Sequence, residues 1–241
     1  MELTEKELQQ EISGYTGRLL RDNFGKGPES VFVSIGYTFI TIYLKKFITP
    51  SERILMEQDQ VMDVQQIRDK LMKSLVPEFK AYLELLTKRK IAEIYYDWGL
   101  HNKSGVIVCV SREPFTDKST IDENFFGKDG LNQEIIDISK QAEKAPEEVY
   151  SCEVNSRTIV NIRNGILVRI EKELIRLGYE QLLKRVKRNL EKQFLHNSSH
   201  IHSILKREVI DSFVDWDFEL DKSVIVFITV PMKQGDVFDR K

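Results

Sequence analysis

Several features are scarce or missing in this sequence of 241 residues. Its only two cysteines, Cys109 and Cys152, form no CxxC pair, which argues against a disulfide scaffold or a thiolate zinc site, and we expect two buried free thiols. No apolar run approaches the ~20 residues needed to cross a bilayer, and the charged start of the chain is unlike a signal peptide. The formal net charge is -2, so no global field would draw the whole molecule to nucleic acid or an acidic membrane.

Catalytic signatures are missing as well. The sequence has no GxSxG, HExxH or GxGxxG motif and no evident pairing of a nucleophile with a base. Residues 26–30 form a basic loop with a glycine, but GxxxxGK[ST] is absent, and this loop leads from a helix into a strand rather than from a strand into a helix. The residues therefore favour a binding or accessory module with no cofactor, and they leave enzyme activity open.

What the chain does contain is an internal repeat. Residues 26–31 recur as 144–149 and residues 91–98 recur as 209–216, both at an offset of 118, which places the two tryptophans in register. Between these anchors the offset is 119, which aligns Glu52-Arg53 with Glu171-Lys172. Such a register predicts two tandem copies of one unit. We place the first at 1–113 and the second at 120–241, with a connector near residues 111–119.

The hydrophobic periodicity of one copy predicts its secondary structure. Helical spacing covers about 4–23, and alternation at 31–35 and 40–44 predicts a hairpin. The segment Thr49-Pro50-Ser51-Glu52 has the form of a capping box, so a helix should begin there and run to about residue 88, with Pro77 kinking or splitting it. A second hairpin follows at 91–98 and 106–111. The fold class is therefore α+β, with two α-β-β-α-β-β units whose antiparallel sheets pack against helices. In the second copy we expect helices at about 131–144 and 171–207.

The second hairpin of the first copy has the densest set of reactive side chains, in a loop at residues 97–105. Its carboxylate, imidazole, amide and ammonium groups could bind a small anion or transfer a proton; they belong to Asp97, His101, Asn102 and Lys103. The same residue types also suit turn hydrogen bonding. The second copy keeps Asp215-Trp216 but has no counterpart of His101 or Asn102. Any specific ligand site therefore belongs to the first copy, and the Asp-Trp pair is expected to be structural in both.

Three histidines, His196, His200 and His202, are spaced as H-x3-H-x-H, and two histidines four residues apart on a helix could share a metal ion. No nearby carboxylate completes a hydrolytic set. We favour a solvated helix or loop and predict no metal site.

A basic stretch distinguishes the second copy. From residue 157 to 207 there are twelve lysines and arginines against four acidic residues. One helix there should bury an apolar face formed by Leu182, Leu183, Val186, Leu190 and Phe194, leaving a basic surface of Lys184, Arg185, Lys187 and Arg188. Such a surface could touch anionic lipid or nucleic acid. We prefer a helix docked on its own sheet with a solvated basic side.

Three segments of the first copy resemble the MpsC family, named after a component of a proposed sodium-translocating, membrane-potential-generating system of bacteria. They are Phe24-Gly25-Lys26-Gly27-Pro28-Glu29-Ser30-Val31, Thr49-Pro50-Ser51-Glu52 and Leu75-Val76-Pro77-Glu78. The second copy matches more weakly, since Ala145 replaces Gly27 and Glu148 replaces Ser30.

The resemblance implies a cytoplasmic, non-enzymatic accessory protein of a bacterial membrane ion or inorganic-carbon transport system. It would act by contacts with a membrane transport protein or complex and would reach the membrane surface through that partner. One alternative is a small-ligand or anion-binding domain that uses the 97–105 loop. A nucleic-acid binder that uses the basic helix is a third and less favoured class. The oligomeric state stays open, a homo-oligomer included.

Overall fold

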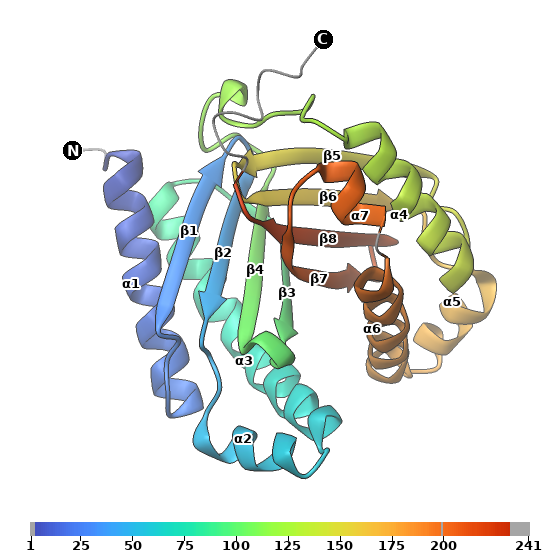
Figure 1. Ribbon diagram of the computed structural model, residues 1–241. Coiled ribbons are helices and arrows are strands. Elements are labelled where there is room, and N and C mark those ends of the chain that lie inside the picture. The colour runs from blue at the N-terminus through green and yellow to red at the C-terminus, as the bar shows by residue number, and fades with distance from the viewer. Residues whose placement is uncertain (1–2, 199, 232–241) are drawn as a thin grey trace. The chain divides into compact units, whose positions relative to one another are not determined.

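The computed structural model describes residues 3–198 and 200–231, and the chain divides into two compact units, Met1–Thr120 and Ile121–Lys241. In each unit a helix is followed by a hairpin, a helical segment and a second hairpin (Figure 1). This confirms the predicted α+β class and the two tandem α-β-β-α-β-β units. We call residues 1–120 unit 1 and residues 121–241 unit 2.

The first helix of unit 1 begins and ends at local signals. Thr4 caps it, with the Thr4 hydroxyl accepting from the Glu7 amide and the Glu7 carboxylate accepting from the Thr4 amide, and Gly25 ends it at a φ of 76°. The elements of unit 1 are α1 (Glu5–Phe24), β1 (Ser30–Gly36), β2 (Phe39–Lys45), α2 (Pro50–Glu57), α3 (Val61–Thr87), β3 (Ile91–Gly99), η1 (Leu100–Asn102), β4 (Ser104–Ser111) and η2 (Lys118–Thr120).

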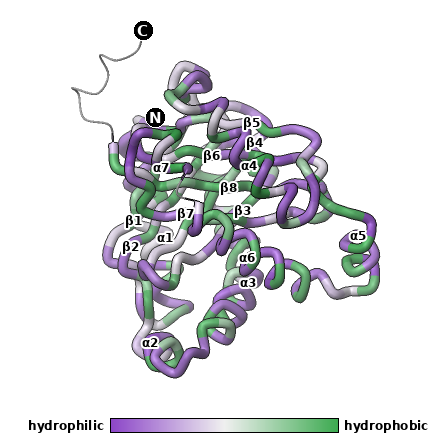
Figure 2. The backbone as a smooth tube through the Cα atoms, turned by 45° about the vertical axis from the view of Figure 1, so that its right-hand side comes forward, coloured by the Kyte–Doolittle hydropathy of each residue, from purple (hydrophilic) through white to green (hydrophobic). Residues whose placement is uncertain are grey.

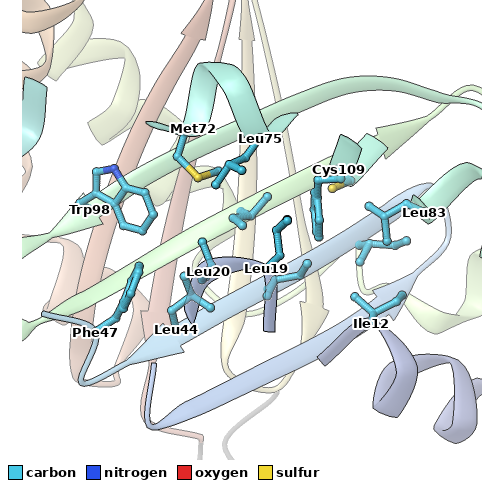
Figure 3. Packing of buried hydrophobic residues seen from close by; sticks show 14 of the residues in the cluster. Ile12, Leu19, Leu20, Leu44, Phe47, Met72, Leu75, Leu83, Trp98 and Cys109 are labelled. Atoms are coloured by element: carbon cyan, nitrogen blue, oxygen red, sulfur yellow. The ribbon is translucent and has the colours of Figure 1, made fainter. Parts of the chain in front are cut away.

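The strands of unit 1 form an antiparallel sheet in the order β1-β2-β4-β3. The helices α1 and α3 cover one face of this sheet and bury a continuous apolar core. Figure 3 shows part of that core, to which α1 contributes Leu20, β2 Leu44, α3 Met72 and β3 Trp98. Cys109 of β4 belongs to it and is a buried free thiol, as is Cys152 in unit 2, so the expectation for both cysteines is confirmed.

Unit 2 repeats this arrangement with the sheet order β5-β6-β8-β7. Its apolar core lies between this sheet and the helices α4, α6 and α7. The elements are α4 (Lys128–Ala142), β5 (Glu148–Asn155), β6 (Thr158–Asn164), α5 (Arg169–Arg176), α6 (Glu180–Asn197), α7 (His200–Leu205), β7 (Val209–Asp217) and β8 (Lys222–Thr229).

Two helix predictions need correction. Of the two outcomes expected at Pro77, a kink or a split, the split is wrong, since α3 continues through Pro77 and buries Leu75, Phe79 and Leu83 against the core. The break lies earlier, at 58–60, where Asp59 adopts a φ of 59° and α2 ends. The single helix expected at 171–207 is three helices, because Gly178, with a φ of 84°, turns the chain between α5 and α6, and α6 ends at Asn197.

Candidate functional site

The 97–105 loop does not present all four of its candidate residues to solvent. Asp97 lies in β3 opposite Val106 and is buried, whereas His101, Asn102 and Lys103 are exposed at η1. Lys103 takes a φ of 53°, and its carbonyl accepts from the Phe47 amide at 2.7 Å. The loop is therefore tied to the chain segment after β2, and three of its four candidate side chains are exposed.

The glycine of this loop has a packing reason. Gly105 pairs with Trp98 across the sheet, and a Cβ at residue 105 would lie 2.5 Å from Cε3 of the indole. In unit 2 the equivalent tryptophan, Trp216, pairs with Ser223 instead. Asp97, Trp98, Asp215 and Trp216 are all buried. The close approach of glycine to indole thus belongs to unit 1 alone.

The most elaborate polar arrangement in unit 1 is a buried ion pair that the sequence analysis missed. Arg68 of α3 is fully buried and donates from Nε and Nη2 to the two carboxylate oxygens of Glu52, each at 2.8 Å, and Nη2 also donates to the Phe47 carbonyl at 2.8 Å. The guanidinium carbon lies 4.6 Å from the ring centroid of Phe47 and 4.7 Å from that of Trp98. Arg68 therefore sits in an aromatic cage, where cation–π attraction adds to the ion pair.

Glu52 serves two purposes at once. Its carboxylate accepts from the Thr49 amide at 2.8 Å, which completes the predicted capping box of α2, and it also binds Arg68. Burial alone would raise the pKa of this carboxyl, but the hydrogen bonds and charge of Arg68, together with Thr49, hold the pKa below its usual value. The pair thus joins the start of α2 to α3 and to the sheet.

Unit 2 contains the counterpart of this pair at the positions that the repeat predicts. Lys187 of α6 is buried and donates to Glu171 at 2.9 Å, and Glu171 accepts from the Val168 amide at the start of α5. The ammonium also contacts Glu143 and lies 5.9 Å from the Trp216 ring centroid. At the offset of 119, Glu171 matches Glu52 and Lys187 matches Arg68. The alignment of Glu52 with Glu171 and of Arg68 with Lys187 is the sequence signal that points to this site.

Unit 2 places further charges where unit 1 has core residues. Arg163 of β6 pairs with Ser223 as Leu44 pairs with Gly105, and Glu191 lies four residues after Lys187 as Met72 does after Arg68. The Arg163 guanidinium donates to Glu191 at 2.6 Å, to Ser139 at 2.8 Å and to the Ser223 hydroxyl at 2.7 Å. Two positions that hold core residues in the first copy, Leu44 and Met72, therefore form an ion pair with its own hydrogen bonds in the second.

Glu143 stands at the edge of this charged region. Burial raises the pKa of its carboxyl to about 7, the neighbouring carboxylates of Glu191 and Glu171 add to the increase, and Lys187 opposes it. Glu143, at the end of α4, and Glu171 of α5 share the ammonium of Lys187, while Glu191 of α6 pairs with Arg163.

The predicted basic surface of α6 is largely wrong. Lys187 and Arg188 are buried, Lys184 is mostly covered and forms an ion pair with Asp215 at 2.6 Å, and Arg185 is half-buried. The predicted apolar face is confirmed only in part, because Leu183 is buried and Phe194 packs against the core of unit 2, but Leu182 and Val186 are exposed. The physical reason is that carboxylates of neighbouring elements pair with these cations, Lys187 with Glu143 and Glu171 and Lys184 with Asp215, so the inner side of α6 is charged.

The three histidines do not share a helix. His196 lies in α6, whereas His200 and His202 lie in α7, and all three are exposed. The His202 ring accepts from the Val209 amide at 3.2 Å, and His200 lies 3.5 Å from Glu134. Within residues 3–198 and 200–231, no group of three metal-ligating side chains is placed to hold an ion.

Comparison with known proteins identifies the family. The family model described as Na+-translocating membrane potential-generating system (MpsC) matches residues 4–113 and 128–230, one segment in each unit. No curated protein and no solved structure matches the chain. In the part of the chain that the structure describes, no helix has both the length and the apolarity to cross a bilayer. With both units matched over most of their length, the chain belongs to the MpsC family and carries two tandem copies of its unit.

Proposed function

We propose that the protein is a non-enzymatic accessory component of a sodium-translocating, membrane-potential-generating system, acting through protein contacts at the membrane surface. The observation that carries this proposal is the family match in both units, because the family is named for such a system. The other components of the system would then carry out the transport.

The use that the chain makes of its reactive side chains supports a non-enzymatic role. Buried carboxylates and cations pair with one another, as in Glu52 with Arg68, Glu171 with Lys187, and Glu191 with Arg163. Buried groups that are paired in this way are poorly placed to meet a substrate. A protein of this construction is suited to present a shaped surface to a partner.

Affinity capture from native membranes tests this proposal. The tagged full-length chain is incubated with detergent-solubilised membranes of its host, and bound proteins are identified by mass spectrometry. The proposal expects polytopic membrane proteins of an ion-transporting system to be enriched over a control bait of similar size and charge. If no membrane protein is recovered above the level of the control bait, the proposed accessory role is contradicted.

The 97–105 loop supports a second proposal of another class, a site for a small anion. His101, Asn102 and Lys103 follow one another at η1 with exposed side chains, which gives imidazole, amide and ammonium groups on a single turn. This site would use residues that unit 2 lacks, so it predicts a ligand bound by unit 1 only. A ligand screen on a His101 variant tests this proposal.

A further inference from the structure

The turn between α5 and α6 exposes apolar side chains that have no place in the core of unit 2. We call residues 169–186 the α5–α6 corner. Figure 1 shows it at one end of the helical layer of unit 2, and Figure 2 shows hydrophobic and hydrophilic residues alternating along it. Five large side chains of the corner are between 48% and 67% exposed: Ile170, Leu177, Tyr179, Leu182 and Val186. Such a grouping marks a contact surface more often than a lone exposed leucine does.

The backbone of the corner is fixed by hydrogen bonds. The Tyr179 amide donates to the Leu174 carbonyl at 2.9 Å and the Gly178 amide donates to the Ile175 carbonyl at 2.9 Å, which is the Schellman pattern of a helix C-terminus. Gly178 supplies the positive φ of 84° that this pattern needs. Leu177 and Tyr179, on either side of Gly178, are therefore held outward by a defined turn.

The corner has a net positive charge, because residues 169–186 hold five lysines and arginines against three glutamates. Glu171 is buried, whereas Glu173 and Glu180 are exposed. Arg169 and Arg185 form no ion pair with any side chain that the structure describes, and Lys172 and Arg176 pair with Asp221 and Glu173. Two guanidinium groups thus flank the apolar side chains without an internal counter-ion. Guanidinium groups bind phosphate in bidentate geometry, so anionic headgroups are their complement.

Unit 1 provides an internal comparison. At the offset of 119, Gln58, Gln60 and Asp63 stand where unit 2 has Leu177, Tyr179 and Leu182, and Gln66 stands where it has Arg185. The corresponding α2–α3 corner, residues 50–67, also exposes apolar groups, Ile54 and Ile67 among them, but it carries exposed acids at Glu57, Asp59 and Asp63. The same fold therefore presents an acidic corner in unit 1 and a basic apolar corner in unit 2.

We propose that the α5–α6 corner of unit 2 docks directly on an anionic bilayer surface. Its aliphatic side chains and Tyr179 enter the boundary between headgroups and acyl chains, while Arg169 and Arg185 pair with lipid phosphates. Apolar side chains with a tyrosine and a cationic rim are the composition of interfacial membrane helices. This inference goes beyond the proposed function, because lipid binding needs no partner protein.

Vesicle co-sedimentation of the full-length chain tests the inference. The lipids are pure phosphatidylcholine and phosphatidylcholine with roughly one-third phosphatidylglycerol. The wild type is expected to bind the anionic vesicles, and to bind them more weakly as salt rises. Leu177→Gln with Tyr179→Gln, which installs the residues of unit 1, should weaken binding by about tenfold or more. Arg169→Gln with Arg185→Gln should abolish the preference for anionic lipid.

The matched control removes apolar surface of a similar kind from unit 1. Ile54→Ser with Ile67→Ser is expected to leave vesicle binding unchanged, and circular dichroism of every variant shows whether it is folded. The inference is overturned if the wild type fails to bind anionic vesicles, or if the Leu177 and Tyr179 variant binds them as well as the wild type does. It is equally overturned if that variant only reduces the mass of a self-associated form, which would assign the corner to a second copy of the chain. Capture of a membrane protein in detergent does not depend on these outcomes, so the two proposals fail separately.

Discussion

The buried pair between Arg68 and Glu52 allows the sharpest test of how unit 1 is held together. Replacing Arg68 by Met removes two hydrogen bonds to the carboxylate of Glu52 and one to the Phe47 carbonyl, along with the contact to the Trp98 ring. Glu52 then keeps the Thr49 amide as a donor but has no cation beside it. Breaking one partner of a buried pair in this way costs about 3–5 kcal/mol, because an uncompensated charge stays buried.

A double-mutant cycle separates the pair from general packing. Glu52→Gln combined with Arg68→Met removes both charges, so the double variant should be more stable than Arg68→Met alone by about 1 kcal/mol or more. The matched control is Arg53→Met. Arg53 lies 3.8 Å from Glu57 with both side chains largely exposed, and such surface pairs contribute about 0–1 kcal/mol.

Tryptophan fluorescence gives a separate signal for unit 1. The chain has only two tryptophans, Trp98 and Trp216, so in a Trp216→Phe background the emission during urea unfolding reports on unit 1. All variants are compared in that background at pH 7. The reasoning is refuted if Arg68→Met costs less than about 1 kcal/mol, or if adding Glu52→Gln restores no stability.

The same pair has a defined pH dependence. Because the pKa of Glu52 in the folded state lies below the ordinary value of 4.5, the stabilisation is present above pH 4.5 and is lost as the pH falls through the lowered pKa. The free energy of unfolding of the wild type, minus that of the uncharged double variant, should therefore decrease as the pH falls below 4.5. It should stay constant from pH 6 upward, because the other titrating groups are common to both proteins.

Three further predictions concern other parts of the chain. Because the pKa of Glu143 is raised to about 7, the folded state binds more protons than the unfolded state between pH 4.5 and 7, so this group makes unit 2 less stable as the pH rises through that window. Urea unfolding of unit 2 should show this slope, at most about 1.4 kcal/mol per pH unit, and Glu143→Gln should flatten it; an unchanged slope would remove Glu143 as its source. Gly105→Ala should lower the free energy of unfolding by about 1–3 kcal/mol, because the new Cβ meets the Trp98 ring. The control is Gly17→Ala in α1, where the new Cβ has room, and it should be neutral or stabilise by up to about 1 kcal/mol. Equal thermal midpoints for the two variants would contradict the packing argument. A metabolite that binds the 97–105 loop should raise the thermal midpoint of the wild type but not that of His101→Ala, since a ligand stabilises only the state that binds it. Equal shifts in both proteins would show that His101 does not contribute to the site.

Local signals in the sequence predicted the elements that depend on neighbouring residues. The Thr49 and Glu52 capping box starts α2 as expected, since both partners lie within one helical turn. The internal repeat predicted two units of the same architecture, because the offset is visible without knowledge of any contact. The sheet order could not be predicted, since it depends on which hairpin strands meet across the unit.

The predictions that failed depended on contacts between distant residues. Hydrophobic spacing placed Leu182 and Val186 inward, but Lys187 and Arg188 occupy the buried side. Lys187 meets Glu171 sixteen residues earlier and Glu143 on another helix. A helical periodicity carries no information on such pairs, so buried cations were taken for a solvated surface.

The break at Asp59 escaped notice for a related reason. Aspartate is one of the few residue types that tolerate a positive φ, so Asp59 can end a helix without a glycine or proline nearby. Pro77 was the more conspicuous helix breaker in the sequence, but it lies at the wrong place. In unit 2 the same turn carries Gly178, and a comparison of the two copies at this position would have located both breaks.

If the chain serves a sodium-translocating system at the membrane, as we propose, then the sodium-dependent membrane potential depends on it. Inverted membrane vesicles are prepared from host cells with and without the gene for this chain, and the sodium-dependent potential is followed with a voltage-sensitive dye. Vesicles lacking the chain should develop a smaller sodium-dependent potential, and added purified chain should restore it. An identical potential in the two preparations would rule out the proposed role.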